Sequence, residues 1–272
     1  MATLSDLKKR LRGVQTICQL AGAMRTVSSA KLSRLQAANY AFTPYARGCR
    51  DLQLAAGAFL SPAPDAPEET LTVLLSGNRG LCGSFHSELF AFFRALPGQE
   101  KMFFIPCGRK AAAWLGERGL PILESFPVSD VPEYAQAEAL ADRIMALYTG
   151  GRVNRVLVVY SEAVNALRQE PRCLELLPGE RVTEEHELLW LPDPDTARQG
   201  LAETCLRAQV YSLLLTCAQG VQAATLTSMR SAYDNGKKSA AELETAINRQ
   251  RQTQVTAGVI ETSSGFLPRG EG

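Results

Sequence analysis

The sequence predicts an α/β domain inserted between two long terminal helices that pair with each other as an antiparallel coiled coil. Twelve of the fourteen prolines lie between Pro62 and Pro194, so both ends of the 272-residue chain are almost free of proline. Because a proline inside a helix costs about 3 kcal/mol, such ends permit long helices. Between them, short apolar runs alternate with helical patterns, which indicates an α/β layer with a largely parallel sheet.

The first long helix is predicted over residues 1–60. Its apolar or small residues recur at steps of three and four, which is the spacing of a coiled-coil seam. These residues are Leu4, Leu7, Leu11, Val14, Cys18, Ala21, Met24, Ser28, Leu32 and Leu35. Pro44 removes a backbone donor, so we expect it to kink or interrupt the helix, which then resumes through Arg47–Leu60.

The α/β domain is predicted over residues 68–192. Its strands are expected at Thr70–Leu75, Lys101–Ile105, Val153–Tyr160, Cys173–Leu177 and Glu187–Leu191. Its helices are expected at Ser84–Leu96, Arg109–Gly119 and Pro132–Leu147.

The second long helix is predicted over residues 195–266, with a tail at 267–272. It follows Pro192-Asp-Pro-Asp195, a strong signal for a helix start. The seam continues through Leu201, Leu206, Val210, Leu213, Cys217, Val221, Ala224, Ser228 and Ala232. Beyond Gly236 aliphatic residues become sparse and glutamines take their place. This polar end cannot belong to the core of its own domain, so it is expected in solvent or inside another protein.

A loop with three glycines, Ser76–Ser84, joins the first strand to the next helix. The glycines fit neither the GxxxxGK[ST] nor the GxGxxG spacing of phosphate-binding loops. We therefore predict a tight turn that requires glycine backbone angles, with structural roles for Gly77, Gly80, Cys82 and Gly83. Anion binding at the helix start and a reactive Cys82 thiol are the weaker alternatives.

Composition argues against several functional classes. The seven cysteines form no CxxC pair and only His86 and His186 are present, so a metal cluster is not expected. Neither histidine belongs to a recognisable catalytic constellation with a nucleophile and an orienting acid, so no catalytic or cofactor-binding residue is predicted. The chain has no apolar run long enough for a membrane span and starts without a signal-peptide pattern, so a soluble cytosolic protein is expected.

Charge is distributed unevenly along the chain. The net charge is +1, but residues 1–50 hold nine Lys and Arg against one acid, Asp6. A basic first helix favours an acidic partner or a phosphate, although a solvated basic face explains the charge equally well.

Three segments together resemble the gamma subunit of F-type ATP synthases. Leu7–Leu32 has the family's basic start, its Ala-Met-x-x-Val stretch and its Ala-Lys-Leu. The glycine loop is similar to the Arg-Gly-Leu-Cys-Gly signature. In the last helix, the positions on the family pattern are Met229, Ala232, Asn235, Leu243, Asn248, Arg249, Arg251, Gln252, Thr256, Glu261 and Gly265.

The resemblance implies a central rotor shaft with a Rossmann-like α/β domain between its two helices. Such a shaft couples ion-driven rotation of the membrane c-ring to conformational change in the catalytic beta subunits. It has no cofactor and no activity by itself. The implied partners are the alpha and beta subunits, the epsilon subunit and the c-ring, with no nucleic acid and no direct membrane insertion. The implied location is the cytoplasmic face of the bacterial inner membrane.

The resemblance also implies which residues contact the alpha/beta ring. They are Lys8, Lys9, Arg12, Met24, Arg25, Asn248, Arg249, Arg251, Gln252, Thr256 and Glu261. The chain departs from the family pattern where a Lys is replaced by Gly22, a Ser-Glu pair by Gly220-Val221, an Arg by Thr225 and a Glu by Gly258. These departures indicate a divergent branch, such as an alternative F-type ATPase.

Two other functions stay open on the sequence alone. One is a nucleotide-binding enzyme built on the α/β domain, and the other is a nucleic-acid-binding coiled coil that uses the basic first helix.

Overall fold

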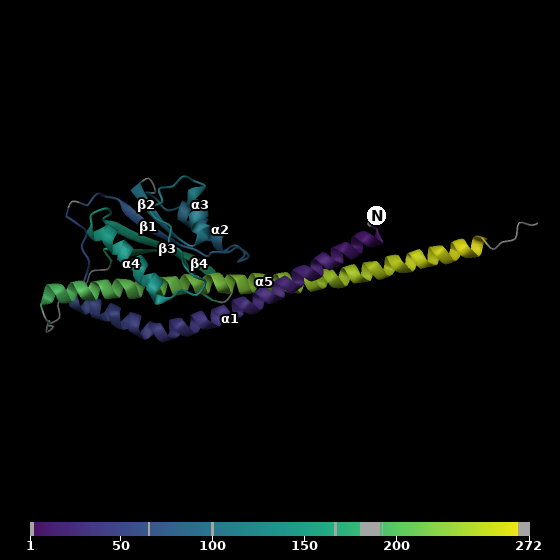
Figure 1. The fold of residues 1–272 in the computed structure, drawn as a ribbon, viewed down its shortest axis with the longest axis horizontal. Helices are drawn as coiled ribbons and strands as arrows, with labels where there is room; N and C mark the ends of the chain where they lie inside the picture. The colour runs from purple at the N-terminus through teal and green to yellow at the C-terminus, as the bar shows by residue number, and fades with distance from the viewer. Residues whose placement is uncertain are drawn as a thin grey trace, which may run out of the picture. The chain divides into compact units, whose positions relative to one another are not determined.

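The computed structural model describes residues 3–64, 66–98, 101–165, 168–179, 191 and 193–265 (Figure 1). The elements in chain order are α1 (Leu4–Ala56), β1 (Thr70–Leu75), α2 (Phe85–Arg94), β2 (Met102–Cys107), α3 (Arg109–Gly116), α4 (Tyr134–Thr149), β3 (Arg155–Ala163), β4 (Gln169–Leu177) and α5 (Pro194–Gly265). The predicted fold class is confirmed. The expected strand Glu187–Leu191 lies outside the described residues except for Leu191, which is not in a strand.

The chain divides into two compact units. Val27–Ser228 forms the first, and the segments before Val27 and after Ser228 form the second. Both long helices belong to both units, because α1 and α5 each cross a boundary.

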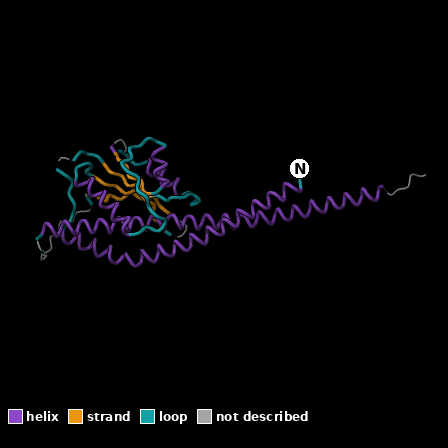
Figure 2. The backbone as a smooth tube through the Cα atoms, viewed as in Figure 1, coloured by secondary structure: helices purple, strands orange, loops and turns teal. Residues whose placement is uncertain are grey.

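The first unit is built on a four-stranded sheet with the strand order β2-β1-β3-β4 (Figure 2). β1 is parallel to both β2 and β3, and its Val73 is in register with Ile105 and Val158. β4 is the antiparallel edge strand beside β3. The prediction of a largely parallel sheet is therefore confirmed.

Both faces of this sheet are covered, because the pleat directs alternate side chains to opposite sides. Leu74 and Val159 face α2 and α3 in one apolar cluster. Val73 and Val158 face α4 and the α5 segment from Ala202 to Ala224 in the other. The sheet is thus packed between two helices on one side and two on the other.

Pro44 does not interrupt α1, so of the two effects expected, a kink or an interruption, the interruption is wrong. The helix is continuous from Leu4 to Ala56, although Figure 1 shows that it curves. The backbone group that lacks a donor is the carbonyl of Tyr40, whose side chain is 86% exposed. Water can reach this carbonyl, and the neighbouring Thr43 Oγ1 donates to the Asn39 carbonyl at 2.6 Å. The missing hydrogen bond is therefore tolerated on the solvent side of the helix.

Candidate partner-binding interface

The second unit consists of the two helix ends, which lie side by side in Figures 1 and 2. The predicted seam residues of α1 in this unit, Leu4, Leu7, Leu11, Val14, Cys18, Ala21 and Met24, are all buried or half-buried, whereas most residues between them are exposed. α5 continues past this pairing, and every residue from Arg251 to Ile260 is exposed. The α5 segment 251–260 therefore presents all its sides to the surroundings.

The predicted contact residues fall into two groups on these helix ends. On α1, Lys8, Lys9 and Arg12 are exposed, while Met24 and Arg25 are half-buried. On α5, the exposed residues are Asn248, Arg249, Arg251, Gln252 and Thr256. Glu261 lies in α5, and its side chain is outside the described part.

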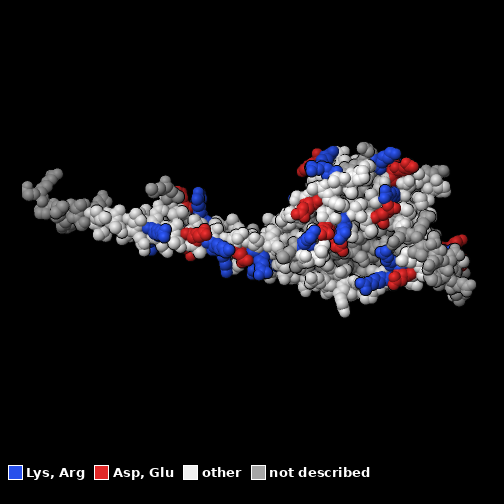
Figure 3. Space-filling view, turned by 180° about the vertical axis from the view of Figure 1, so that it is seen from behind, with Lys and Arg blue, Asp and Glu red and all other residues white. Residues whose placement is uncertain are grey.

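This unit is rich in unpaired cations. Its sequence contains eleven Lys and Arg against six Asp and Glu. Among its described residues, no ion pair within 4 Å is present. In the space-filling view, blue side chains gather along the paired helices (Figure 3). The surface can therefore accept carboxylates from a partner.

One of the few acids in the unit has a structural task. Asp6 Oδ2 accepts hydrogen bonds from the backbone and the hydroxyl of Thr3 at 3.1 and 2.8 Å, and Thr3 Oγ1 accepts from the Asp6 amide at 3.2 Å. This reciprocal arrangement caps the start of α1. The hydrogen bonds from Thr3 lower the pKa of the Asp6 carboxyl.

The end of α5 also carries apolar side chains that the sequence analysis missed. Val255, Val259 and Ile260 are 60%, 61% and 60% exposed. We had read this end as polar because the glutamines dominate it. The spacing of Val255 and Val259, one helical turn apart, was the available signal.

The glycine loop in the first unit brings strand ends and α5 close together. A Cβ atom added to Gly77 would lie 3.1 Å from Val221 Cγ1, so glycine allows α5 to approach. Gly83 has φ of 59° and Leu81 has φ of 66°, both in the left-handed region. Gly80 lies next to the Lys110 side chain, at 4.0 Å from an added Cβ.

Cys82 is buried within this loop. Burial raises the pKa of its thiol, which disfavours the reactive thiolate. His86 Nε2 lies 3.1 Å from the Arg79 carbonyl oxygen, and burial lowers the pKa of its ring. Neither group has the environment of an activated nucleophile or a charged base. His186 lies outside the described residues.

The crevice where a Rossmann-like sheet binds nucleotides is occupied by α5. This crevice lies at the carboxyl ends of the strands, where the strand order reverses between β1 and β3. There, a Cβ on Gly220 would lie 3.1 Å from Phe85 Cε2 and 3.2 Å from the Ser161 carbonyl oxygen. The remaining cavity is about 30 Å³, far below the roughly 300 Å³ that a small-molecule site requires. The geometry of this crevice therefore does not support nucleotide binding there.

Two departures from the family pattern have a structural reason at this point. A side chain at Gly220 would press against Phe85 and β3, and the methyl groups of Val221 fill the space above Gly77. Thr225 is buried, and its hydroxyl donates to the Val221 carbonyl at 2.7 Å. Gly258, in contrast, has open space around it.

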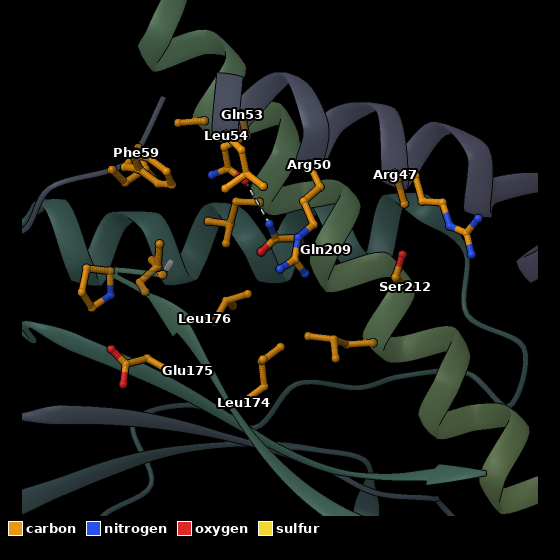
Figure 4. Close-up of a pocket in the computed structure, with 18 of the residues that line it drawn as sticks. Arg47, Arg50, Gln53, Leu54, Phe59, Leu174, Glu175, Leu176, Gln209 and Ser212 are labelled. Carbon is orange, nitrogen blue, oxygen red and sulfur yellow. Dashed lines mark hydrogen bonds between the residues drawn. The ribbon is translucent and has the colours of Figure 1, made fainter. Parts of the chain in front are cut away.

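A larger cavity of about 380 Å³ lies elsewhere in the first unit, between α1, β4 and α5 (Figure 4). Gln53 and Gln209 join the two helices across it with a hydrogen bond of 3.1 Å. Leu174 and Leu176 line its other side, on β4. No sequence motif pointed to this cavity.

Comparison with known proteins identifies the chain. A family model described as ATP synthase matches residues 3–267. The ATP synthase gamma chain of Desulforamulus reducens is 30% identical, over 97% of this chain and 98% of the relative. The chain belongs to the ATP synthase gamma-chain family. The gamma chain of Chlorobaculum tepidum is 29% identical over the same shares of both chains.

Solved structures share the gamma-chain fold. A chain of the Euglena gracilis mitochondrial ATP synthase, in an OSCP/F1/c-ring structure, has a TM-score of 0.72 at 16% identity and covers 99% of this chain and 98% of its own. A chain of the Tetrahymena thermophila central stalk and c-ring structure has a TM-score of 0.62 at 23% identity, with 78% and 99% covered.

Family membership settles the main functional expectation. A gamma chain is the central shaft of the rotor and a non-catalytic subunit of the ATP synthase, so the predicted function and the predicted lack of enzymatic activity are confirmed. Across the described residues, no helix combines the length and the apolarity needed to cross a bilayer.

Proposed function

We propose that this gamma chain drives its partner subunits by placing the paired ends of α1 and α5 inside the ring of alpha and beta subunits. The observation that carries this proposal is the exposure of every residue from Arg251 to Ile260 on a helix that continues beyond its partner. Exposed aliphatic and charged side chains on a single helix gain most when another protein surrounds them.

The asymmetry of this end provides the mechanism. A pair of unequal helices that continues as one helix has no threefold symmetry, so it presents different side chains to each of three beta subunits. Each angle of the shaft then has a different affinity for each beta conformation. Only such a difference in affinity can shift the conformational equilibrium of a partner.

The contact chemistry follows from the side chains. The guanidinium groups of Arg249 and Arg251 can bind beta carboxylates with two parallel hydrogen bonds, and Gln252 can donate and accept. Lys8, Lys9 and Arg12 on α1 provide a second basic surface for acidic loops of the ring. Val255 and Val259 provide the apolar part of the contact.

We place the remaining partners at the α/β domain. In this arrangement the epsilon subunit and the c-ring bind the Val27–Ser228 unit, and rotation of the c-ring turns the shaft. The complex then lies at the cytoplasmic face of a bacterial inner membrane, and the gamma chain is attached to it peripherally.

Reconstitution tests the proposal. The chain is combined with alpha and beta subunits of the same organism, and ATP hydrolysis and the rotation of a probe on gamma are measured. We expect the wild-type chain to support both. The double variant Arg251→Ala, Gln252→Ala should bind the ring about tenfold more weakly, because charge-assisted hydrogen bonds contribute about 1.5–3 kcal/mol each.

The matched control is Arg94→Ala, which removes an exposed arginine from α2 and should have no effect. Equal loss in both variants would contradict the proposed contact. The isolated chain should not bind ATP or NAD at micromolar concentration, and such binding would favour the enzyme alternative instead.

A further inference from the structure

We propose that Tyr233 is a positioning residue that holds Arg25 and Lys237 together as one cationic contact for a carboxylate of the surrounding ring. This inference rests on the proposed function, because it assumes that the helix ends lie inside the ring. It also assigns a replacement for the lysine that the family pattern has where this chain has Gly22.

The aromatic ring of Tyr233 has two cations near it. The Arg25 guanidinium carbon lies 4.8 Å from the ring centroid, and Lys237 Nζ also lies 4.8 Å from it. Both distances are within the ~6 Å over which a cation is attracted to an aromatic face. Arg25 comes from α1 and Lys237 from α5, so the ring joins side chains of both helices.

The two helices approach closely at this arrangement. A Cβ added to Gly22 would lie 3.4 and 3.5 Å from two carbon atoms of the Tyr233 ring, at ordinary van der Waals distance, so the ring lies directly against this position of α1. One turn nearer the N-terminus of α1, Cys18 Sγ occupies the space in which a Cβ added to Gly236 would lie. The helices are therefore close together where Tyr233 lies, and the ring contacts position 22 of α1.

The two cations remain available to a partner. Within the described residues, neither Arg25 nor Lys237 has a carboxylate at ion-pair distance. A guanidinium that stacks on a ring keeps its N–H edges free for a carboxylate. Two like charges beside one ring also repel each other, and a bound carboxylate relieves that repulsion.

The position of the positive charge is thus changed relative to the family pattern. The lysine expected at position 22 is absent, and the Tyr233 ring lies against this position. Arg25 and Lys237, fixed by that ring, provide the charge from a neighbouring place on the same helix pair. Stacking restricts two flexible side chains before binding, which lowers the entropy lost when the partner binds.

The test measures the affinity of the labelled, full-length gamma chain for the alpha/beta ring at low and at high salt. Tyr233→Leu keeps an apolar side chain but removes the aromatic face, and we expect binding at low salt to weaken about threefold. Tyr233→Phe keeps the face and should bind like the wild type. In an Arg25→Ala, Lys237→Ala background, Tyr233→Leu should have no further effect.

A reciprocal pair completes the test. Gly22→Lys should weaken binding while Tyr233 is present, because the new side chain starts in contact with the Tyr233 ring and competes with Arg25 for it. Combined with Tyr233→Ala, the same Gly22→Lys change should restore binding. Helix content and melting temperature of each variant, measured by circular dichroism, show whether a loss of affinity comes from misfolding.

The outcomes separate the two proposals. If the wild-type chain does not bind the ring, the proposed function fails. If the wild type binds but Tyr233→Leu has the wild-type affinity, or loses as much affinity without Arg25 and Lys237 as with them, then the positioning role of Tyr233 is overturned while the proposed function stands.

Discussion

The close approach of the helices at Gly236 allows a sharp prediction about the second unit. A Cβ at Gly236 would lie less than 3.0 Å from Cys18 Sγ, whereas relaxed contacts between heavy atoms are about 3.5–4.0 Å. Gly236→Ala must therefore either rotate the Cys18 side chain or separate the helices. Overpacking of this kind costs about 1–3 kcal/mol.

Helix propensity acts in the opposite direction. Replacing a glycine inside a helix by alanine stabilises it by about 1 kcal/mol. For Gly236→Ala alone we expect the steric cost to exceed this gain, with a net destabilisation of about 1 kcal/mol. In a Cys18→Ala background the obstacle is absent, so the same change should stabilise the chain by about 1 kcal/mol.

The assay is denaturant unfolding followed by the far-ultraviolet circular dichroism of the helices, on all four members of the cycle. The expected coupling between the two positions is about 2 kcal/mol, with a reversal of sign. If Gly236→Ala stabilised the chain equally in both backgrounds, the close contact between Cys18 and Gly236 would be wrong, and with it the helix spacing that places Tyr233.

Three further predictions concern the first unit. Burial alone would raise the pKa of Asp130, but Lys31, whose Nζ lies 2.5 Å from Asp130 Oδ2, lowers this pKa below its usual value. The ion pair should therefore stabilise the fold fully above about pH 4 and lose its contribution below that. Asp130→Asn should remove this part of the acid sensitivity, measured by urea unfolding at several pH values. Cys173 is exposed, unlike the other six cysteines, although partial burial of its sulfur raises the pKa of the thiol. One thiol should therefore react with a disulfide reagent, faster as the pH rises above neutral, and Cys173→Ser should abolish this reaction. Ala46→Leu extends into the 380 Å³ cavity and should raise the melting temperature, whereas Ala111→Leu, in a fully packed site, should lower stability by about 1–3 kcal/mol.

Hydrophobic spacing carried most of the fold prediction. The seam from Leu4 to Leu35 is periodic enough to identify both the helix and its buried side. Hydrophobic spacing did not predict segments whose side chains face solvent instead of packing against another element. The first half of β4 was missed because its residues are polar, and Arg172 there pairs with Glu162 and Glu170 on the outside of the edge strand.

Contacts between distant residues were not predictable from local patterns. Tyr233 follows no motif, and its role depends on Gly22, which is more than two hundred residues away in the sequence. The continuity of α1 through Pro44 was likewise not predictable, because it depends on whether the Tyr40 carbonyl faces water. The residues predicted to contact the alpha/beta subunits come from the family pattern alone. Exposure shows that Arg251 is accessible, but it does not show what Arg251 binds.

Because α5 fills the crevice of the sheet, a free ligand is excluded from it. Residues around Val221 occupy the place where related architectures hold a diffusing molecule, and they are covalently attached to it. A tethered occupant acts at a high effective concentration, so a free competitor would need exceptional affinity to replace it. The crevice is therefore permanently occupied by α5. The contacts that would bind a substrate in an enzyme of this fold instead hold the shaft helix against the sheet.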